Sequence, residues 1–252
     1  LSMGEIEPCE GYLAKLQKIT SKGLESFIKE LHEAIIQSEI VYWDDTVIQI
    51  NTHRSCMRYY GNEDICLFKA HEKKNKEGLD KDNILSLLDK NTVVEHDHNK
   101  VNYNPEYEFI NAECCQHLLR DLKKVEVNIP ERTWCKKMIE LFQKYDHQRK
   151  ELIKEGIDTF TEEELNEFIL QIDHWLLKGL EENKEDSKVF YAKNEIALIW
   201  RIMEYRDNYI YWVLDFSIPF TNNLSERNLR GIKSKMKIAG QFQNIERARD
   251  YA

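Results

Sequence analysis

Three acidic residues in separate segments have side chains suited to binding divalent metal ions. Asp44 or its neighbour Asp45 lies in a run of β-branched and aromatic residues, Asp97 ends a second such run, and Glu226 follows a Pro-Phe-Thr-Asn-Asn sequence. Mg²⁺ binds a few carboxylate oxygens and keeps water or phosphate in its other positions. Two such ions, about 3.5–4 Å apart, can stabilise both the attacking and the leaving oxygen at a phosphodiester. These residue types therefore fit hydrolysis or transfer at a phosphodiester.

Each acid also has a structural interpretation. Acids at strand ends and turns commonly face water, although strands are depleted in Asp, which favours a role for Asp44 and Asp97. Glu226 stands three positions after Asn223, the spacing of a capping box at the start of a helix. From the residues alone, both interpretations stay open.

A helix predicted over about 222–237 places Glu226 at the head of a basic stripe. Its apolar residues Leu229, Ile232 and Met236 fall on one face. Residues 217–241 contain five Lys or Arg and one Glu, a net charge of +4; the cationic residues are Arg227, Arg230, Lys233, Lys235 and Lys237. Such cations neutralise DNA phosphates. The alternative is a solvated basic face.

The overall charge of −9 argues against a nucleic-acid partner, but its distribution does not. Residues 155–186 contain eleven Asp or Glu and two Lys, a net charge of −9, so the remainder of the chain sums to zero. An acidic segment therefore lies in a chain with a basic strip near its end. The acidic segment would repel DNA, and we expect it to face solvent or a partner subunit.

The elements that must position the acids alternate between helices and strands. A helix is predicted over 10–38. Strands are predicted over 40–50, about 55–60 and about 64–70, and the turn-forming Gly61-Asn62 favours an antiparallel meander. A helix over 77–89 and a strand over 92–97 follow, with 109–112 as a further candidate strand.

Residues from about 113 to 210 are predicted to be helical almost throughout. Apolar residues recur at helical spacing; one such stripe is Ile196, Ile199, Trp200 and Met203. Trp134 and Trp175 are more typical of a core than of base stacking. Pro130 and residues 183–188 are the best internal boundaries.

Three segments resemble the catalytic motifs of insertion-sequence 66 family transposases, enzymes of the Asp-Asp-Glu class. They read Tyr-Trp-Asp-Asp-Thr at 42–46, Val-Glu-His-Asp at 94–97 and Pro-Phe-Thr-Asn-Asn-Leu-Ser-Glu-Arg at 219–227. The family's first motif is usually Asp-Glu-Thr, so Asp44 takes the catalytic place and Asp45 that of its neighbour. The second often reads Asp-Gly, whereas His98 follows Asp97 here. The third matches at every fixed position, and the resemblance covers roughly residues 10–252.

The resemblance implies an α/β, ribonuclease-H-like fold. Its mixed sheet would have flanking helices and a large all-α insertion between the second and third catalytic acids. The expected N-terminal helical segment is 1–39, and the first part of the core is 40–128. The helical insertion would span 129–210, and the core would be completed by 211–252, which contains the catalytic-Glu helix. The resemblance also implies that Asp44, Asp97 and Glu226 bind two Mg²⁺ or Mn²⁺ ions, which serve DNA strand cleavage and strand transfer in transposition. The five cations of residues 217–241 would hold the DNA backbone.

A Cys-x-x-His pair followed by basic residues also resembles the family. Cys114 and His117 form the pair, and Arg120 is the first of the basic residues. A structural zinc normally takes four ligands, which disfavours a zinc site. We expect Cys114 and His117 to be structural positions that orient the active site, as we do Asn222 and Asn223 of the third motif.

The expected partners are the transposon ends and target DNA, with a homo-oligomer assembled on DNA. Recognition of transposon ends is expected in an N-terminal region outside this chain. No run of about 18 apolar residues occurs, so no membrane span is predicted. The six cysteines are scattered and do not suggest a disulfide framework, which predicts a reducing cytoplasm. Two rival hypotheses are another ribonuclease-H-like nuclease, such as a junction resolvase, and a non-catalytic remnant or interaction module.

Overall fold

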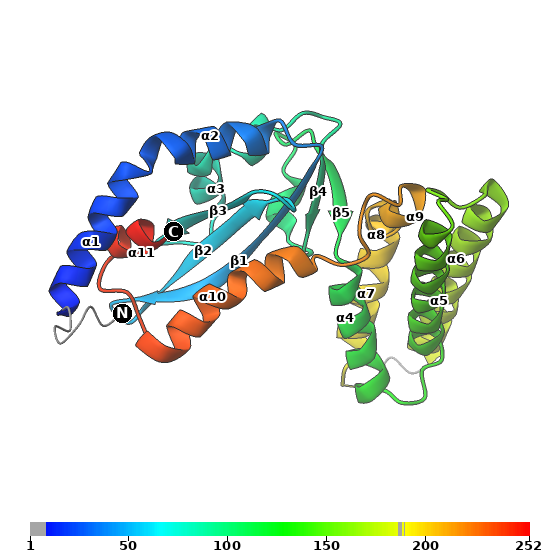
Figure 1. Ribbon diagram of the computed structural model, residues 1–252. Coiled ribbons are helices and arrows are strands. Elements are labelled where there is room, and N and C mark those ends of the chain that lie inside the picture. Colours follow the sequence, from blue (N-terminus) through cyan, green and yellow to red (C-terminus); the bar gives the residue numbers. More distant parts are fainter. Residues whose placement is uncertain (1–8, 186–187, 189) are drawn as a thin grey trace. The chain divides into compact units, whose positions relative to one another are not determined.

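The computed structural model describes residues 9–185, 188 and 190–252, in two compact units (Figure 1). The first, here called the sheet unit, contains the described parts of 1–94, 99–110 and 223–252. The second, the helical unit, contains those of 95–98 and 111–222. No helix among the described residues is both long and apolar enough to cross a membrane.

A five-stranded mixed sheet has the strand order β3-β2-β1-β4-β5. The strands are β1 (Ile40–Ile50), β2 (His53–Gly61), β3 (Cys66–His71), β4 (Val93–His96) and β5 (Ile110–Glu113). β1 pairs antiparallel with β2, and β2 with β3, so the predicted meander is confirmed. The last two residues of β4 and the last three of β5 belong to the helical unit.

The turn between β2 and β3 requires glycine at position 61. A Cβ atom there would lie 2.1 Å from the carbonyl oxygen of Ile65 and 2.6 Å from the hydroxyl of Tyr59. The turn is closed by Asn62, whose Oδ1 accepts the backbone N–H of Asp64 and of Ile65, each at 2.9 Å. The sequence-based turn at Gly61-Asn62 is therefore confirmed, and its glycine is needed for close approach.

Each face of the sheet in the sheet unit has its own hydrophobic cluster. On one face, Trp43 packs with Ile35 of α2 (Glu25–Ile36) and Leu79 of α3 (Lys76–Asp82). On the other, Ile48 packs with Leu229 of α10 (Asn223–Ala239); α11 (Ile245–Tyr251) adds to the same cluster. Figure 1 shows α10 running along β1. Because neighbouring side chains of a strand point to opposite faces, β1 contributes alternate residues to the two clusters.

Two predicted helices of the sheet unit are shorter than expected. The helix predicted over 10–38 is divided into α1 (Glu10–Gly23) and α2, next to Gly23, a residue of low helix propensity. The helix predicted over 77–89 ends at Asp82, because Asn83 takes a left-handed φ of 53°. The 3₁₀ turn η1 (Leu85–Leu87) then completes the segment.

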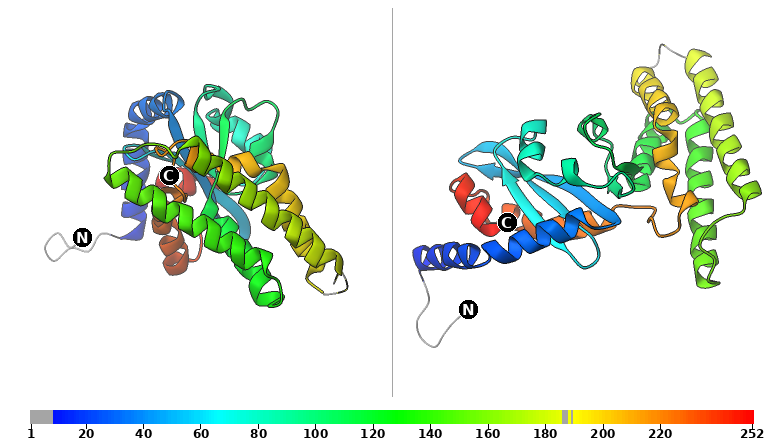
Figure 2. Two further views of the ribbon diagram at one scale, coloured as in Figure 1. Left: turned by 90° about the vertical axis from the view of Figure 1, so that its right-hand side faces the viewer. Right: turned by 90° about the horizontal axis from the view of Figure 1, so that it is seen from above.

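Long helices make up most of the helical unit. They are α4 (Cys115–Asn128), α5 (Trp134–Lys154), α6 (Glu162–Glu185) and α7 (Ala192–Glu204), followed by the short α8 (Arg206–Tyr209) and α9 (Tyr211–Leu214). Each long helix packs on the next along the chain (Figure 2). Phe168 joins α5 to α9, with its ring 5.4 Å from that of Phe142 and 5.9 Å from that of Trp212. Trp134 is fully buried, as expected, and Trp175 is partly buried.

Candidate active site

β1 presents Asp44 and Asp45 to opposite faces of the sheet. Asp45 Oδ1 lies 2.7 Å from Lys74 Nζ, and the Asp45 side chain is 7% exposed. Asp44 alternates with Tyr42 and Ile48, which pack in the cluster that contains α10. Its Oδ1 accepts the N–H of Asp45 at 2.7 Å, and the residue is partly buried. Asp44 is therefore the acid of β1 on the α10 side.

Glu226 lies in the first turn of α10 and is partly buried. At about 100° per residue it is about 60° around the helix from the buried Leu229, at the edge of the packed stripe. Tyr59, the cross-strand partner of Asp44, contacts Asn228 of the same helix. Burial raises the pKa of Tyr59 to about 12, so its hydroxyl stays neutral. The sheet unit thus brings Asp44 and Glu226 to the same face of the sheet.

Asp97, in the helical unit, comes directly after the last residue of β4. The predicted strand over 92–97 is one residue too long at each end, so Asp97 lies just outside β4. His96 anchors this end, with Nδ1 2.9 Å from the Asp97 carbonyl oxygen and Nε2 2.7 Å from Asn111 Oδ1. The carboxylate Oδ1 of Asp97 lies 2.7 Å from His117 Nδ1 in α4, and the two side chains are 34% and 30% exposed. Asp97 is therefore in contact with the Cys-x-x-His motif.

Glu95, two residues before Asp97, is a buried carboxyl that the sequence reasoning missed. It is 1% exposed, and burial, followed by the negative charge of Asp97, raises its pKa well above the ordinary value. Arg149 opposes this shift only in part. A carboxyl that stays protonated adds no charge beside Asp97. Its place directly after two valines in the predicted strand is the signal that could have identified it.

Cys114 and Asn222 join three segments of the helical unit. Cys114 precedes α4 and is buried, and its Sγ accepts the backbone N–H of Asn222 at 3.1 Å. The Asn222 side-chain amide donates to the Glu95 carbonyl oxygen at 3.3 Å. Burial raises the pKa of Cys114 to about 12, so it remains a thiol. These contacts bind the segment before α10 to the end of β4 and the start of α4. Asn223 is exposed and is the first residue of α10.

Arg149 of α5 anchors the same segment from the other side. Its guanidinium donates to the carbonyl oxygens of Phe216 and Ile218, the latter at 2.9 Å, and lies 5.6 Å from the Phe216 ring centroid. The buried Arg149 thus satisfies two carbonyls of the chain that leads into the third motif. Nothing in the spacing of the sequence indicated this role.

Two sets of side chains have donor atoms for a metal. In the sheet unit these are the carboxylates of Asp44 and Glu226. In the helical unit they are Asp97, Cys114 and His117, whose potential ligand atoms all lie within 4.8 Å of one another. Carboxylates suit Mg²⁺ or Mn²⁺, whereas a set with thiolate and imidazole suits zinc.

The cations of α10 differ in their surroundings. Four are exposed: Arg227, Arg230, Lys233 and Lys237. Lys235 is partly buried, with Nζ 5.2 Å from the ring centroid of Phe242 and 4.7 Å from that of Tyr251. Two aromatic rings therefore engage the Lys235 ammonium, which is less available to an external anion than the other four.

Comparison with protein families gives a match over residues 2–250, almost the whole chain, to the sequence model described as Transposase IS66 family. The chain belongs to the IS66 family of transposases. This confirms the resemblance inferred from the three motifs. No curated protein and no solved structure matches the chain. A transposase acts on DNA, so membership of the family implies DNA binding.

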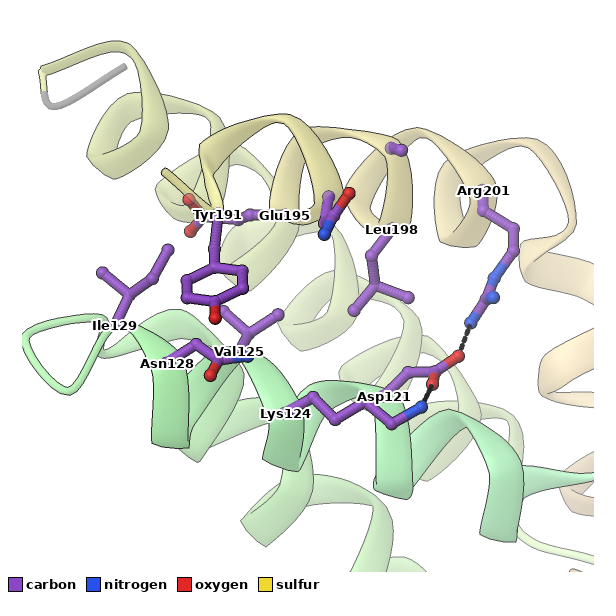
Figure 3. Close-up of a pocket in the computed structure, with 11 residues that line it drawn as sticks. Asp121, Lys124, Val125, Asn128, Ile129, Tyr191, Glu195, Leu198 and Arg201 are labelled. Carbon is purple, nitrogen blue, oxygen red and sulfur yellow. Dashed lines mark hydrogen bonds and ion pairs between the residues drawn. The ribbon is translucent and has the colours of Figure 1, made fainter. Parts of the chain in front are cut away.

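A pocket of about 380 Å³ lies between α4 and α7 of this transposase (Figure 3). Two cations converge on Asp121: Arg201 at 2.9 Å and Lys124 at 2.8 Å. None of the motif residues lines this pocket, and its most prominent charges compensate one another. We therefore assign it no catalytic role.

Proposed function

We propose that this transposase cuts and transfers DNA strands at a metal centre formed by Asp44, Asp97 and Glu226. The observation that carries the proposal is the division of the two β1 acids between the faces of the sheet. Asp44 shares its face with α10, which bears Glu226, whereas Asp45 is paired with Lys74 on the opposite face. Membership of the IS66 family supports the assignment.

The order of elements supports a ribonuclease-H-like fold for the core. Three antiparallel strands are followed by a helix and by β4, which lies next to β1 in the sheet. We propose that 40–128 and 211–252 form the two parts of this core and that 129–210 is the helical insertion between them, after the N-terminal segment 1–39.

The three carboxylates suit hard divalent cations, Mg²⁺ or Mn²⁺, because they offer oxygen donors only. Asp44, Asp97 and Glu226 are each partly buried, so all three stay reachable from solvent. When bound, two such ions supply the activation of water for the first cut and of the freed 3′-hydroxyl for strand transfer. The chain itself holds the carboxylates on ordered backbone: Asp44 within β1, Asp97 next to the anchored His96, and Glu226 in the first turn of α10.

The exposed cations of α10 are proposed to hold the DNA backbone next to Glu226. Arg230, Lys233 and Lys237 continue the stripe that Glu226 begins, and Arg227 follows Glu226 directly. Contacts to phosphate fix position and carry no sequence information. Lys235 has a smaller part, because its ammonium packs against Phe242 and Tyr251.

The acidic helix α6 is proposed to face away from DNA. Its first turn carries Glu162, Glu163 and Glu164, and like charges repel phosphate. The transposase is also proposed to assemble as a homo-oligomer on transposon-end DNA, in a reducing cytoplasm.

The test compares Asp44→Asn with Asp45→Asn on DNA that carries the transposon ends, with Mg²⁺ or Mn²⁺ present. Both changes keep side-chain size and remove one charge. Asp44→Asn is expected to abolish cleavage and strand transfer, and Asp45→Asn to keep most of both. The ion pair lost in Asp45→Asn has a half-exposed Lys74, and such pairs contribute only about 0–1 kcal/mol, so that variant should stay folded.

Three results would contradict the proposal. Equal activity of Asp44→Asn and the parent would remove Asp44 from the centre. Cleavage without joining of strands would indicate another ribonuclease-H-like nuclease. A parent chain that neither binds Mn²⁺ nor cuts DNA would indicate a non-catalytic remnant.

A further inference from the structure

The contact between Asp97 and His117 is continued by Arg120. His117 Nδ1 lies 2.7 Å from Asp97 Oδ1, and on the other side of the ring Nε2 lies 3.0 Å from the Arg120 guanidinium. His117 and Arg120 are three residues apart in α4, so they share one side of the helix. The imidazole is thus in contact with a carboxylate at one nitrogen and with a cation at the other.

Arg120 determines which ring nitrogen carries the proton. A guanidinium has five N–H donors and no acceptor. Nε2 of His117 must therefore accept the hydrogen bond from Arg120. In a neutral imidazole the proton is then on Nδ1, the nitrogen that faces Asp97.

The same geometry argues against a metal ion on this histidine. The donor atoms of Asp97, Cys114 and His117 are close enough together to hold one. A histidine that binds a metal through Nδ1 carries its proton on Nε2 and donates it to a carboxylate, a carbonyl or water. Here Arg120, a donor, is at Nε2. In addition, Cys114 Sγ already accepts the backbone N–H of Asn222.

We propose that His117 and Arg120 are positioning residues for Asp97. Arg120 fixes the imidazole tautomer with its proton on Nδ1, and that nitrogen lies 2.7 Å from Asp97 Oδ1 and holds it by electrostatic attraction. A carboxylate held at one oxygen cannot rotate freely, so its second oxygen is fixed in direction before a cation binds. This last step rests on the proposed function, because it takes Asp97 as a metal ligand.

Cys114 and Asn222 support this arrangement by fixing the start of α4. The Asn222 N–H binds Cys114 Sγ, and its side-chain amide binds the carbonyl oxygen of Glu95. His117 lies three positions after Cys114, in the first turn of the helix. The two members of the Cys-x-x-His motif therefore have distinct parts: one fixes the helix start and the other orients the acid.

The first test reads the tautomer and needs neither metal nor activity. Two-bond ¹H–¹⁵N spectra of the histidine rings distinguish Nδ1–H from Nε2–H, and the His117→Asn spectrum assigns the His117 signals. The Nδ1–H tautomer is expected in the parent, with a shift toward Nε2–H in Arg120→Ala. An Nε2–H tautomer in the parent would overturn the proposal. So would Zn²⁺ binding that moves the Nδ1 resonance and is lost in Cys114→Ser.

The second test measures Mn²⁺ affinity by calorimetry in the parent, His117→Asn and His117→Gln. The amide nitrogen of Asn can occupy the place of Nδ1, whereas that of Gln takes the place of Nε2. The His117→Gln variant is expected to bind Mn²⁺ about 10–100-fold more weakly than the parent. The His117→Asn variant is expected to keep an Mn²⁺ affinity close to that of the parent. Parent affinity in both variants, or the same loss in both, would overturn the role of the Nδ1–H donor.

The two tests also separate this proposal from the proposed function. If the parent and Asp97→Asn bind Mn²⁺ equally, the metal centre at Asp97 is wrong. The tautomer measurement then decides the Arg120–His117–Asp97 arrangement alone.

Discussion

Replacement of Arg132 by Met should strongly destabilise the helical unit, because it leaves Glu195 without its cation. Glu195 is 0% exposed, and its Oε1 accepts from Arg132 Nε and from Trp134 Nε1, each at 2.8 Å. Asn183 donates to Oε2, also at 2.8 Å. The Arg132 side chain is 5% exposed, so both partners of the ion pair are buried.

Loss of one partner of a buried ion pair typically costs about 3–5 kcal/mol, because an uncompensated charge stays in the interior. Trp134 and Asn183 would still donate to the Glu195 carboxylate, so we expect Arg132→Met to lose about 3 kcal/mol, at the lower end. The double variant Arg132→Met/Glu195→Gln has no buried charge and should recover at least half of this loss.

Urea unfolding, followed by tryptophan fluorescence and far-ultraviolet circular dichroism, measures both values. Arg132→Met, Glu195→Gln and the double variant form a double-mutant cycle with the parent. This cycle isolates the coupling free energy between Arg132 and Glu195. A loss below about 1 kcal/mol in Arg132→Met would refute the reasoning, since an exposed pair gives a value of that size. So would a double variant that is less stable than Arg132→Met.

Three further predictions concern DNA binding, pH and the β2–β3 turn. Arg230→Ala should reduce the slope of log affinity for DNA against log salt concentration by about 0.9, whereas Lys235→Ala should leave that slope almost unchanged and lower the melting temperature. Burial raises the pKa of Cys135 to about 11, so the folded state keeps a proton that the unfolded state has lost; stability should fall from about pH 9 to about pH 11. Cys135→Ala should make this decline shallower by about 1.4 kcal/mol per pH unit. Gly61→Ala should cost about 3 kcal/mol or more in urea unfolding, because the added Cβ meets the Ile65 carbonyl; a loss below about 1 kcal/mol would contradict this.

The strand that carries Asp44 and the meander that follows it could be predicted from the sequence because their signals are local. The run of β-branched and aromatic residues gave the bounds of β1, and Gly61-Asn62 gave the following meander. The third motif also predicted a helix start close to the observed Asn223. Each of these predictions depends on neighbours within a few positions.

Contacts between distant residues could not be predicted in this way. The stripe expected on α7 included Trp200, which is 55% exposed, and omitted Glu195, which is fully buried. Hydrophobic periodicity treats Glu as an outward residue, whereas here a buried arginine more than sixty positions away compensates it. Similarly, the contact of Asp97 with His117 depends on how α4 begins after β5.

α10 begins at Asn223, so Glu226 lies one position beyond the place of a capping-box acid, and we propose that it is a metal ligand. The most direct measurement is the rate of transposon-end cleavage by Glu226→Gln with Mg²⁺, beside its melting temperature. Gln keeps the size of Glu but lacks the charge that a metal ligand needs. We predict an unchanged melting temperature and a rate lower by at least about 100-fold, equal to about 2.7 kcal/mol of transition-state stabilisation. A cleavage rate close to that of the parent would contradict this role and would leave Glu226 as a partly buried polar residue of the first turn of α10.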